Sequence, residues 1–181
     1  KGNVAVYYNS SCGDSYYSHQ EPNMDLSAYS FTVEGNDPDR TPPVIDVESL
    51  TMTLPDGRET VTAGDEVSFS IEVTDESGVY RTALEYRNVE TGYWKSVYFS
   101  YNSESGKWEG AFSVDEDTDN GEWELLYIYA QDDKGNDAYY YNSSCHHSYY
   151  SSQEPNMDLS AYSFTVSPNK RILFDTNGGS A

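Results

Sequence analysis

Basic residues are scarce in this sequence, which has 10 lysines and arginines against 31 aspartates and glutamates and a formal net charge of -21 at pH 7. Such a charge repels phosphate backbones and anionic lipid surfaces, so we expect neither nucleic-acid binding nor contact with a membrane. No apolar run approaches the roughly 20 residues that a membrane-spanning helix needs, and no signal peptide opens the chain. The negative charge instead favours solubility, cation binding or a basic partner.

Residues that favour helices are also few. Leucine, alanine and methionine are uncommon, whereas tyrosine occurs 18 times beside abundant serine, threonine and valine. This composition is typical of exposed β-strands, and no segment has a sustained helical period. The sequence therefore predicts an all-β protein.

The residue sets that usually carry catalysis are missing. The three histidines all lie in variable positions of one loop, no GxSxG nucleophile motif occurs, and no glycine-rich phosphate cradle follows a strand. A hydrolase built from paired carboxylates is the alternative that 31 acidic residues leave open. We expect a protein without enzymatic activity.

One segment occurs twice, because residues 140–166 repeat residues 7–33 at an offset of 133 positions. The copies differ only at three pairs of positions, which are Gly13 and His146, Asp14 and His147, and His19 and Ser152. A period of this length is a whole domain. We therefore expect one complete domain, residues 44–166, preceded by residues 1–33 as the C-terminal part of another repeat. Since both ends cut through repeating units, the missing targeting signals say nothing about a longer parent protein.

The only two cysteines, Cys12 and Cys145, occupy equivalent places in the two copies. Each repeat thus carries one thiol, which excludes a disulfide within a repeat. We expect a free or partly exposed thiol. A bridge between neighbouring repeats is the alternative, and it would need the two Cα atoms within about 7 Å.

Turn signals divide the complete domain into short strands. Residues 34–43 contain glycine, asparagine, aspartate and three prolines, which is typical of a stiff linker. After this linker, strand-like segments recur about every 10 to 15 residues, which is the pattern of a β-sandwich. Trp108 and Trp123 are expected to pack in the core or at its rim. In the partial copy we expect strands at residues 4–8 and 28–33. The strands expected in the complete domain, all antiparallel, are residues 44–53, 66–74, 79–87, 93–101, 107–114, 122–130 and 138–141.

Five short stretches carry a family resemblance. They are residues 39–45 (DRTPPVI), 63–67 (AGDEV), 73–79 (VTDESGV), 120–123 (NGEW) and 130–136 (AQDDKGN). With them, residues 39–142 resemble the bacterial Ig-like repeats of surface proteins in Gram-positive gut bacteria. The resemblance implies an Ig-like antiparallel β-sandwich in an extracellular protein, at the cell surface or attached to the cell wall. Such modules have many roles, so the resemblance supports the fold more than the function.

A second resemblance lies at the far end of the sequence. Residues 172–180 (ILFDTNGGS) resemble the first strand of the small Listeria and Bacteroides-type repeat of cell-surface proteins. We therefore interpret residues 167–181 as a linker and the first strand of a following small repeat. Together the two resemblances imply a long, multidomain surface protein in which each repeat is monomeric.

Acidic turns form the first candidate site. In a sandwich of this strand order, the start of the first strand and the turns near residues 75 and 132 lie at the same end of the domain. Their oxygen ligands suit Ca²⁺, which takes 6 to 8 oxygens at about 2.3 to 2.6 Å. The alternative is a set of solvated turn residues, since Asp and Asn favour turns for their own reasons. The predicted ligands are Asp39, Asp75, Asp132, Asp133 and Asn136, with Asp37 and Glu76 close by.

Two further metal candidates are weaker. The acidic turn at residues 115–121 resembles a calcium loop, but Leu126 stands where such a loop needs its final glutamate. Residues 145–147, Cys-His-His, offer soft ligands for a transition metal. Adjacent residues rarely face one ion, however, and the first copy has Gly13 and Asp14 in place of the two histidines.

The duplicated loop is the candidate recognition site. Residues 142–160 form a long connection where sandwich loops usually take only a few residues. Its tyrosines alternate with serine and asparagine, and such a surface combines large contact area with adaptable hydrogen bonds. The alternatives are tyrosines that pack on their own domain, and a near-identity that reflects recent gene duplication alone. The predicted contact residues are Tyr140, Tyr141, Tyr149 and Tyr150, with Tyr16 and Tyr17 in the partial copy.

These observations favour a non-enzymatic, repeated binding module that captures a host protein through its Tyr-rich loop. The family resemblance implies host immunoglobulin as the specific candidate, because some gut surface proteins built of such repeats capture it. Two alternatives belong to other classes. One is a calcium-stiffened spacer domain in an adhesin stalk, and the other is a carbohydrate-binding module in which Tyr149, Tyr150 or Trp94 stacks on sugar rings.

Overall fold

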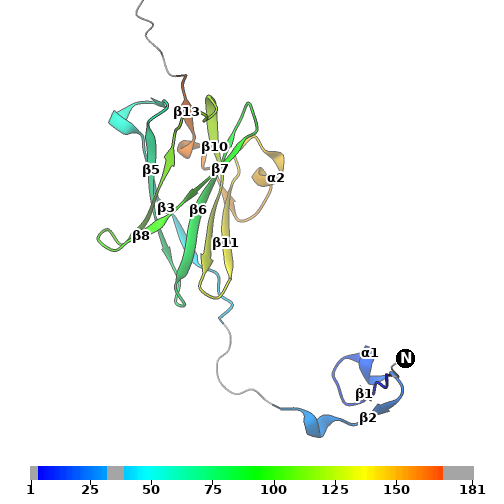
Figure 1. Ribbon diagram of the computed structural model, residues 1–181. Helices are drawn as coiled ribbons and strands as arrows, with labels where there is room; N and C mark the ends of the chain where they lie inside the picture. The colour runs from blue at the N-terminus through cyan, green and yellow to red at the C-terminus, as the bar shows by residue number, and fades with distance from the viewer. Residues whose placement is uncertain (1–3, 32–38, 169–181) are drawn as a thin grey trace, which may run out of the picture. The chain divides into compact units, whose positions relative to one another are not determined.

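The computed structural model describes residues 4–31 and 39–168. The chain divides into two compact units, Lys1–Pro38 and Asp39–Ala181. The second unit is a β-sandwich built from two sheets (Figure 1). Half of the expected linker, residues 34–38 including Asp37, and the stretch 172–180 with its surface-repeat resemblance lie outside the described residues.

The first sheet is antiparallel and has four strands. Their order is β3 (Val44–Thr53), β5 (Glu66–Thr74), β9 (Lys107–Ser113) and β8 (Ser100–Asn102). Apolar and polar residues alternate along β5, so that Val67, Phe69 and Ile71 are buried while Glu66 and Ser68 are exposed. This period of two is what buries one face of a sheet and leaves the other in water.

The second sheet is built around β10 (Gly121–Asp132). One edge of β10 pairs with β6 (Val79–Asn88), and β7 (Trp94–Tyr98) lies beyond β6. The other edge is shared by β11 (Asp137–Asn142) and β13 (Phe164–Val166). Two short strands extend this edge in parallel, β12 (Asn156–Met157) beside β11 and β4 (Thr60–Val61) beside β13.

This strand order is that of an Ig-like sandwich, in which strands one, two, four and five of the fold form one sheet and the others form the second. The predicted fold class is therefore confirmed. The predicted strands 44–53 and 66–74 match β3 and β5 residue for residue, and four others agree within two residues at each end.

The prediction of one strand over residues 93–101 is wrong. The chain leaves the second sheet after β7 and joins the first sheet at β8. At the crossing, Phe99 is buried in the core and its backbone N–H donates to the carbonyl of Thr82. Because the backbone stays extended and no glycine or proline marks the change, the sequence carries no signal for it.

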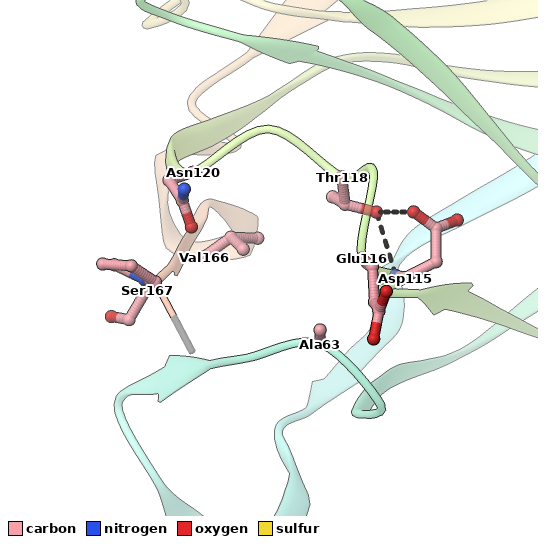
Figure 2. Close-up of a pocket in the computed structure, with 8 residues that line it drawn as sticks. Ala63, Asp115, Glu116, Thr118, Asn120, Val166 and Ser167 are labelled. Carbon is pink, nitrogen blue, oxygen red and sulfur yellow. Dashed lines mark hydrogen bonds between the residues drawn. The ribbon is translucent and has the colours of Figure 1, made fainter. Parts of the chain in front are cut away.

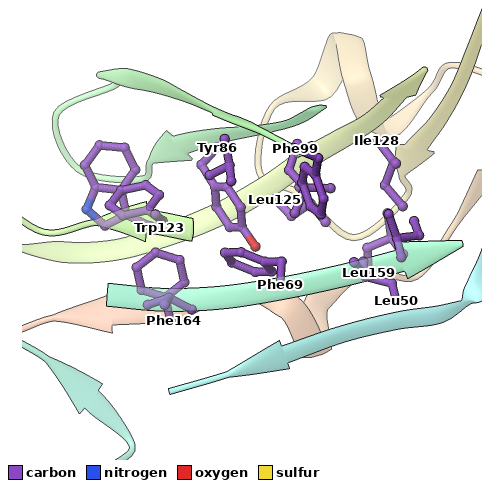
Figure 3. Close-up of a cluster of buried hydrophobic side chains, with 14 of the residues drawn as sticks. Leu50, Phe69, Tyr86, Phe99, Trp123, Leu125, Ile128, Leu159 and Phe164 are labelled. Carbon is purple, nitrogen blue, oxygen red and sulfur yellow. The ribbon is translucent and has the colours of Figure 1, made fainter. Parts of the chain in front are cut away.

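Aromatic side chains from both sheets fill the core (Figure 3). Trp123 is fully buried, as expected, and its Nε1 donates to the carbonyl of Asp119 at 2.9 Å. Tyr86 is also fully buried, and its hydroxyl donates to the carbonyl of Tyr162 at 2.8 Å. This hydrogen bond satisfies the one polar atom of the Tyr86 side chain, which would otherwise destabilise the core. Trp108 packs at the rim.

The duplicated segment of the complete domain contributes to this core. Leu159 is fully buried, and Phe164 and Val166 enter the core from β13. Cys145 is buried as well, so the expectation of a partly exposed thiol is wrong for this residue, although both cysteines are free. Burial raises the pKa of the Cys145 thiol above its usual value.

The first unit repeats the local structure of this segment without a sandwich. β1 (Tyr8–Asn9) pairs in parallel with β2 (Asn23–Met24), in the register that β11 and β12 use. The single-turn helices α1 (Ser15–Ser18) and α2 (Ser148–Ser151) correspond, and so do the 3₁₀ turns η1 (Ser27–Tyr29) and η3 (Ser160–Tyr162). The conformation is therefore set by interactions inside the segment.

One buried asparagine holds the segment together. The Oδ1 of Asn142 accepts from the backbone N–H groups of Ser144 and Leu159, both at 3.0 Å. In the first copy, Asn9 Oδ1 accepts from Ser11 and Leu26 in the same way. A single side chain thus joins the two ends of the loop.

The strand predicted at residues 4–8 of the first unit is wrong, and so is the described part, residues 28–31, of the strand predicted at 28–33, whose last two residues lie outside the described chain. Of residues 4–8, only Tyr8 is in a strand, and residues 27–29 form η1 instead. The equivalent residues of the complete domain become β11 and β13 only where β10 pairs with them. The described residues of the first unit include no such partner for residues 4–7 or 28–31.

The duplicated leucines give a matched test of this arrangement. We expect Leu159→Ala to lower the free energy of unfolding of the sandwich by about 2 to 5 kcal/mol, because it leaves a cavity under the loop. The half-buried Leu26 should be replaceable by alanine without effect on the sandwich. Urea titration followed by tryptophan fluorescence measures this, since all three tryptophans lie in the second unit. Equal effects of the two changes on the free energy of unfolding would contradict the placement of Leu159, and not Leu26, in the core of the sandwich.

Candidate functional site

The outer surface of the second sheet is covered by tyrosines. The register places Tyr127 opposite Tyr141 and Tyr129 opposite Tyr139. Their rings touch in a ladder, with centroids 5.9 Å apart in the first pair and 4.9 Å in the second, while Tyr139 and Tyr141 stack along β11 at 5.7 Å. The solvent face of an antiparallel sheet is ordinarily polar, so this concentration of rings is unusual for a structural surface.

The loop adds further rings to this ladder. Figure 1 shows α2 outside the sheet beside β10 and β11. Tyr150 packs there against Tyr127 at 5.5 Å, and its other side meets Trp94 at 5.5 Å. Tyr149 meets Tyr150 edge to face at 5.0 Å and remains 60% exposed. We call the whole surface the aromatic face, which consists of Trp94, Tyr127, Tyr129, Tyr139, Tyr141, Tyr149 and Tyr150.

The four contact residues predicted in the complete domain fall into two groups. Tyr141, Tyr149 and Tyr150 belong to the aromatic face, whereas Tyr140 lies opposite Ile128 and packs against the core. Side chains alternate along a strand, so the three consecutive tyrosines of β11 cannot share one side. Sequence reasoning missed the β10 tyrosines and Tyr139, although a strand with tyrosine at alternate positions is a signal for such a face.

Tyr16 and Tyr17 lie on α1 in the first unit. Both are exposed, and their rings meet edge to face at 5.1 Å, as those of Tyr149 and Tyr150 do. In this unit Tyr17 stacks only against Tyr8, at 6.3 Å, among the described residues. The first copy therefore has the aromatic turn of the loop without the ladder beneath it.

A polar edge borders the aromatic face. The Arg81 guanidinium lies 4.9 Å from the centre of the Tyr129 ring and donates to its hydroxyl at 2.9 Å. The same hydroxyl donates to Asp137 Oδ1 at 2.7 Å. Burial raises the pKa of Tyr127 above its usual value, and the Glu85 carboxylate raises it further. The Tyr127 hydroxyl thus stays protonated and can donate a hydrogen bond to a partner.

Buried charges fasten the loop to the sheet. Glu124 is almost fully buried and forms an ion pair with Arg87 at 3.2 Å. Its other oxygen accepts from the backbone N–H of His146 at 2.7 Å and lies 2.9 Å from His146 Nδ1. His147 points elsewhere, against Tyr150 at 4.9 Å and Trp94 at 6.0 Å. The two adjacent histidines therefore face different partners, and their arrangement fits no metal site.

The first copy uses the equivalent positions differently. Asp14 caps α1, since its carboxylate accepts from the backbone N–H of Tyr16 at 2.9 Å. His147 makes no such cap on α2. A cap of this kind stabilises a helix by about 1 kcal/mol. In the complete domain His147 lacks this cap and instead contacts Trp94 of the sheet.

A second candidate site lies where the chain enters the sandwich. Asp39, Asp75 and Asp132 each present one carboxylate oxygen, and these three oxygens lie within 4.8 Å of one another. They come from the segment before β3, the turn after β5 and the end of β10, as the strand order predicted. We call this group the acidic junction.

Hydrogen bonds fix two of the three carboxylates. Asp132 is 1% exposed, and its oxygens accept from the backbone of Lys134 and from the backbone and side chain of Asn136. Burial raises the pKa of Asp132, but these hydrogen bonds outweigh it and hold the pKa below its usual value. Asp75 Oδ1 accepts from the N–H and the hydroxyl of Ser77, both at 2.8 Å.

Asp39 leaves one oxygen without a partner. Its Oδ1 accepts from the N–H of Thr41 at 2.9 Å, whereas Oδ2 is buried and has no hydrogen-bond donor among the described residues. Three carboxylates this close repel one another, and a buried unpaired anionic oxygen is costly. The residues present therefore fit a hard cation that prefers oxygen ligands, such as Ca²⁺.

Of the other two predicted ligands, Asn136 lies beside the group and Asp133 does not. Asn136 donates through Nδ2 to Asp132 at 2.6 Å and to the carbonyl of Asp39 at 3.2 Å, so it positions the carboxylates. Asp133 is exposed, and its carboxylate lies against Gly78. Sequence reasoning could not separate Asp132 from Asp133, because either can face inward at the end of a strand.

The acidic turn at residues 115–121 lines a pocket at the opposite end of the sandwich (Figure 2). The Thr118 hydroxyl donates to Asp115 Oδ1 at 2.8 Å and accepts from the Asp115 N–H at 3.0 Å. Lys95 lies 3.7 Å from the same carboxylate. Lys95 thus offsets the charge of Asp115, and the acidic residues of this turn do not form a group like that of the acidic junction among the described residues.

Comparisons with known proteins assign no family to this chain. Neither the protein-family models nor the curated proteins compared with this chain match it. Among solved structures, Cwp6 from Clostridium difficile is similar, with 16% identity and a TM-score of 0.46. The match covers 66% of this chain and 17% of that chain, so it spans less than a fifth of Cwp6. A likeness of this extent carries no argument about function.

In the described part of the chain, no helix combines the length and the apolar character that crossing a bilayer requires.

The contact between His146 and Glu124 should make the stability of the sandwich depend on pH. The hydrogen bond to Glu124 and the charge of that carboxylate raise the pKa of His146. A raised pKa stabilises the fold fully below the pKa of the unfolded histidine, about 6.5, and the stabilisation is lost as the pH rises through the folded value. We expect the melting temperature of the wild type to exceed that of His146→Gln below about pH 6, with a smaller difference at higher pH.

A double-variant cycle checks the cause of this dependence. With Glu124→Gln in both proteins, the pH-dependent difference that His146→Gln makes should disappear. Thermal melting between about pH 5 and pH 9 measures all four proteins, a range that spans the titration of the histidine. A difference that persists without the Glu124 carboxylate would assign the effect to another group.

Proposed function

We propose that this domain is a non-enzymatic, repeated recognition module of an extracellular bacterial surface protein, and that its aromatic face binds a host protein. The observation that carries the proposal is the concentration of contacting rings on the outer surface of the second sheet. Burying an exposed aromatic patch against a partner removes apolar surface from water, and tyrosine loses little conformational entropy in doing so.

The chemistry around the face supports a protein partner. At the edge of the face the Tyr129 hydroxyl bonds to Arg81 and Asp137, and Gln131 donates to the same Asp137 oxygen. An apolar centre with a polar edge is the usual build of a protein interface. The net charge of -21 further favours a partner with a basic surface. The specific partner we propose is immunoglobulin, on the family resemblance of residues 39–142.

Tyr149 is the best residue with which to test binding, because it is exposed while Tyr150 is packed between the loop and the sheet. We expect Tyr149→Ala to weaken immunoglobulin binding about thirtyfold, which corresponds to about 2 kcal/mol, with little change in melting temperature. The matched control is Tyr101→Ala, which removes an exposed tyrosine from β8 in the other sheet. Biosensor titration of the full chain measures both affinities.

Three results would redirect this proposal. Normal binding by the Tyr149→Ala protein, with loss in the Tyr101→Ala protein, would move the interface to the first sheet. Absence of immunoglobulin binding together with a response on a glycan panel would favour the carbohydrate-binding alternative. Absence of binding to serum proteins and to glycans would leave the spacer function.

A structural role for calcium is the second function that a specific observation favours. The buried Oδ2 of Asp39 has no hydrogen-bond donor among the described residues, and a cation at the acidic junction would compensate its negative charge. Asp39 lies at one end of the sandwich, beside Asp132, and β13 leads out at the other, beside Gly121. The twelve residues of β10, which run between these two ends, span about 40 Å. An ion held by Asp39, Asp75 and Asp132 would stiffen the connection to the preceding unit.

Melting experiments test the calcium proposal. At about 100 times its Kd, an ion that binds only the folded state adds about 2.7 kcal/mol of stability. We expect millimolar Ca²⁺ to raise the melting temperature of the wild type and a chelator to reverse the change. Asp75→Asn should abolish the response, whereas the control Asp133→Asn should keep it. A melting temperature independent of calcium would exclude the site. An equal loss of the calcium response in both variants would place the bound ion elsewhere.

A further inference from the structure

One carboxylate lies among the rings of the outer surface. Glu85 is on β6, which runs between β7 and β10, and the register places it between Ser96 and Tyr127. The neighbouring rung of the sheet has Tyr98 and Tyr129 on the two sides of β6. Tyr98 is 68% exposed and extends the aromatic surface onto β7. Glu85 is therefore bordered by tyrosines of both adjacent strands, because side chains on diagonal positions are within reach of an aromatic ring.

The charge of Glu85 has no cation to balance it among the described residues. Its Oε2 accepts from the Ser96 hydroxyl at 2.7 Å, while Oε1 accepts no hydrogen bond and neither oxygen forms an ion pair in that part of the chain. The two arginines of β6 are engaged elsewhere, since Arg87 pairs with Glu124 and Arg81 bonds to a tyrosine hydroxyl. Burial raises the pKa of the half-buried Glu85 above its usual value. The carboxylate is thus partly desolvated and uncompensated.

The rings around Glu85 select among cations. Burial raises the pKa of Tyr127 and of Tyr150, and the nearby Glu85 carboxylate raises both further, so a cation held there would lie against aromatic rings. A guanidinium suits such a place, because it is planar, weakly hydrated and stacks on aromatic faces. The same surface holds an internal example, in which the Arg81 guanidinium lies 4.9 Å from the centre of the Tyr129 ring.

We propose that Glu85 is the specificity-determining residue of the aromatic face and that it binds an arginine side chain of the partner protein. The guanidinium donates to the Glu85 carboxylate and packs against the rings of Tyr98 and Tyr127. This inference rests on the function proposed above, since it names the group of a host protein that the face recognises. Charge-assisted hydrogen bonds are about twice as strong as neutral ones, and arginine and tyrosine are enriched among the residues that dominate binding energy.

A sugar is the other ligand that such a surface suits, because its hydroxyls donate to a carboxylate while its ring stacks on tyrosine. A neutral sugar would bury Glu85 further and leave its negative charge uncompensated, which is unfavourable. The missing countercharge therefore favours arginine over a sugar.

Blocked amino acids test this site directly. The probes are N-acetyl-arginine methylamide and its lysine and citrulline counterparts, of which citrulline has nearly the shape of arginine without the charge. The full chain, labelled with ¹³C in its tyrosine rings, is titrated with each probe by NMR at about 150 mM salt, which screens the general attraction of the acidic chain for cations. We expect the arginine probe to shift the ring signals of Tyr98 and Tyr127, the lysine probe to bind more weakly and the citrulline probe to have no effect.

A pair of variants assigns the binding to Glu85. Glu85→Gln removes the charge and keeps an oxygen that accepts from Ser96, and the matched control Glu48→Gln removes one exposed carboxylate from β3 in the other sheet. We expect Glu85→Gln to weaken binding of the arginine probe about tenfold or more and Glu48→Gln to leave it unchanged. The melting temperature of Glu85→Gln at neutral pH should not fall, because a carboxyl whose pKa is raised in the folded state destabilises the fold there. A purely structural role of Glu85 predicts a lower melting temperature.

Loss of arginine binding in Glu85→Gln alone supports the proposal. Equal binding by the two variants, equal responses to arginine and citrulline or to arginine and lysine, or ring shifts with sugars in place of arginine would overturn it.

Immunoglobulin separates this inference from the proposed function. If Tyr149→Ala weakens immunoglobulin binding and Glu85→Gln does not, the proposed function stands and the role of Glu85 is wrong. If the arginine probe binds at Glu85 and immunoglobulin does not bind, the arginine site stands and the proposed partner is wrong.

Discussion

The pairing of β10 on both edges is the constraint on which the rest of this domain depends. One edge meets β6 along most of its length, and the other is divided between β11 and β13. The inward side chains of β10 build the core, those that point outward carry half of the tyrosine ladder, and its last residue, Asp132, supplies the buried carboxylate of the acidic junction. Both candidate sites are therefore positioned by one strand, and a shift in its register would move both.

A bulge in β10 gives the two halves of its outer surface different roles. The register with β6 shifts between Leu125 and Tyr127, and Leu126 is fully buried outside the main cluster of core side chains. Up to this point the outer side is covered, with Glu124 beneath His146. Beyond it, Tyr127 and Tyr129 face outward. The duplicated loop thus covers one half of the strand and extends the tyrosine ladder of the other.

The sequence predicts those features that depend on local periodicity and on strand order. Alternation delimits β3 and β5, and the order of strands brings Asp39, Asp75 and Asp132 together. The sequence does not predict features that depend on strand register or on side-chain packing. The inward direction of Tyr140 follows from where the β10–β11 hairpin turns, and the burial of Cys145 follows from the loop folding back onto the sheet. Neither is encoded in the type of residue alone.

The two copies separate what sets conformation from what sets stability. Because Asn9 and Asn142 hold the same turns in both copies, the local structure needs no sandwich. Because Phe31 and Phe164 differ so widely in exposure, the stabilising burial comes from the sandwich alone. Sequence change between the copies is confined to positions that meet the sheet or cap the helical turn, and it leaves the core contacts untouched. The shared asparagine therefore sets the shape of the segment in both copies, whereas the residues that differ set its contacts with the sheet.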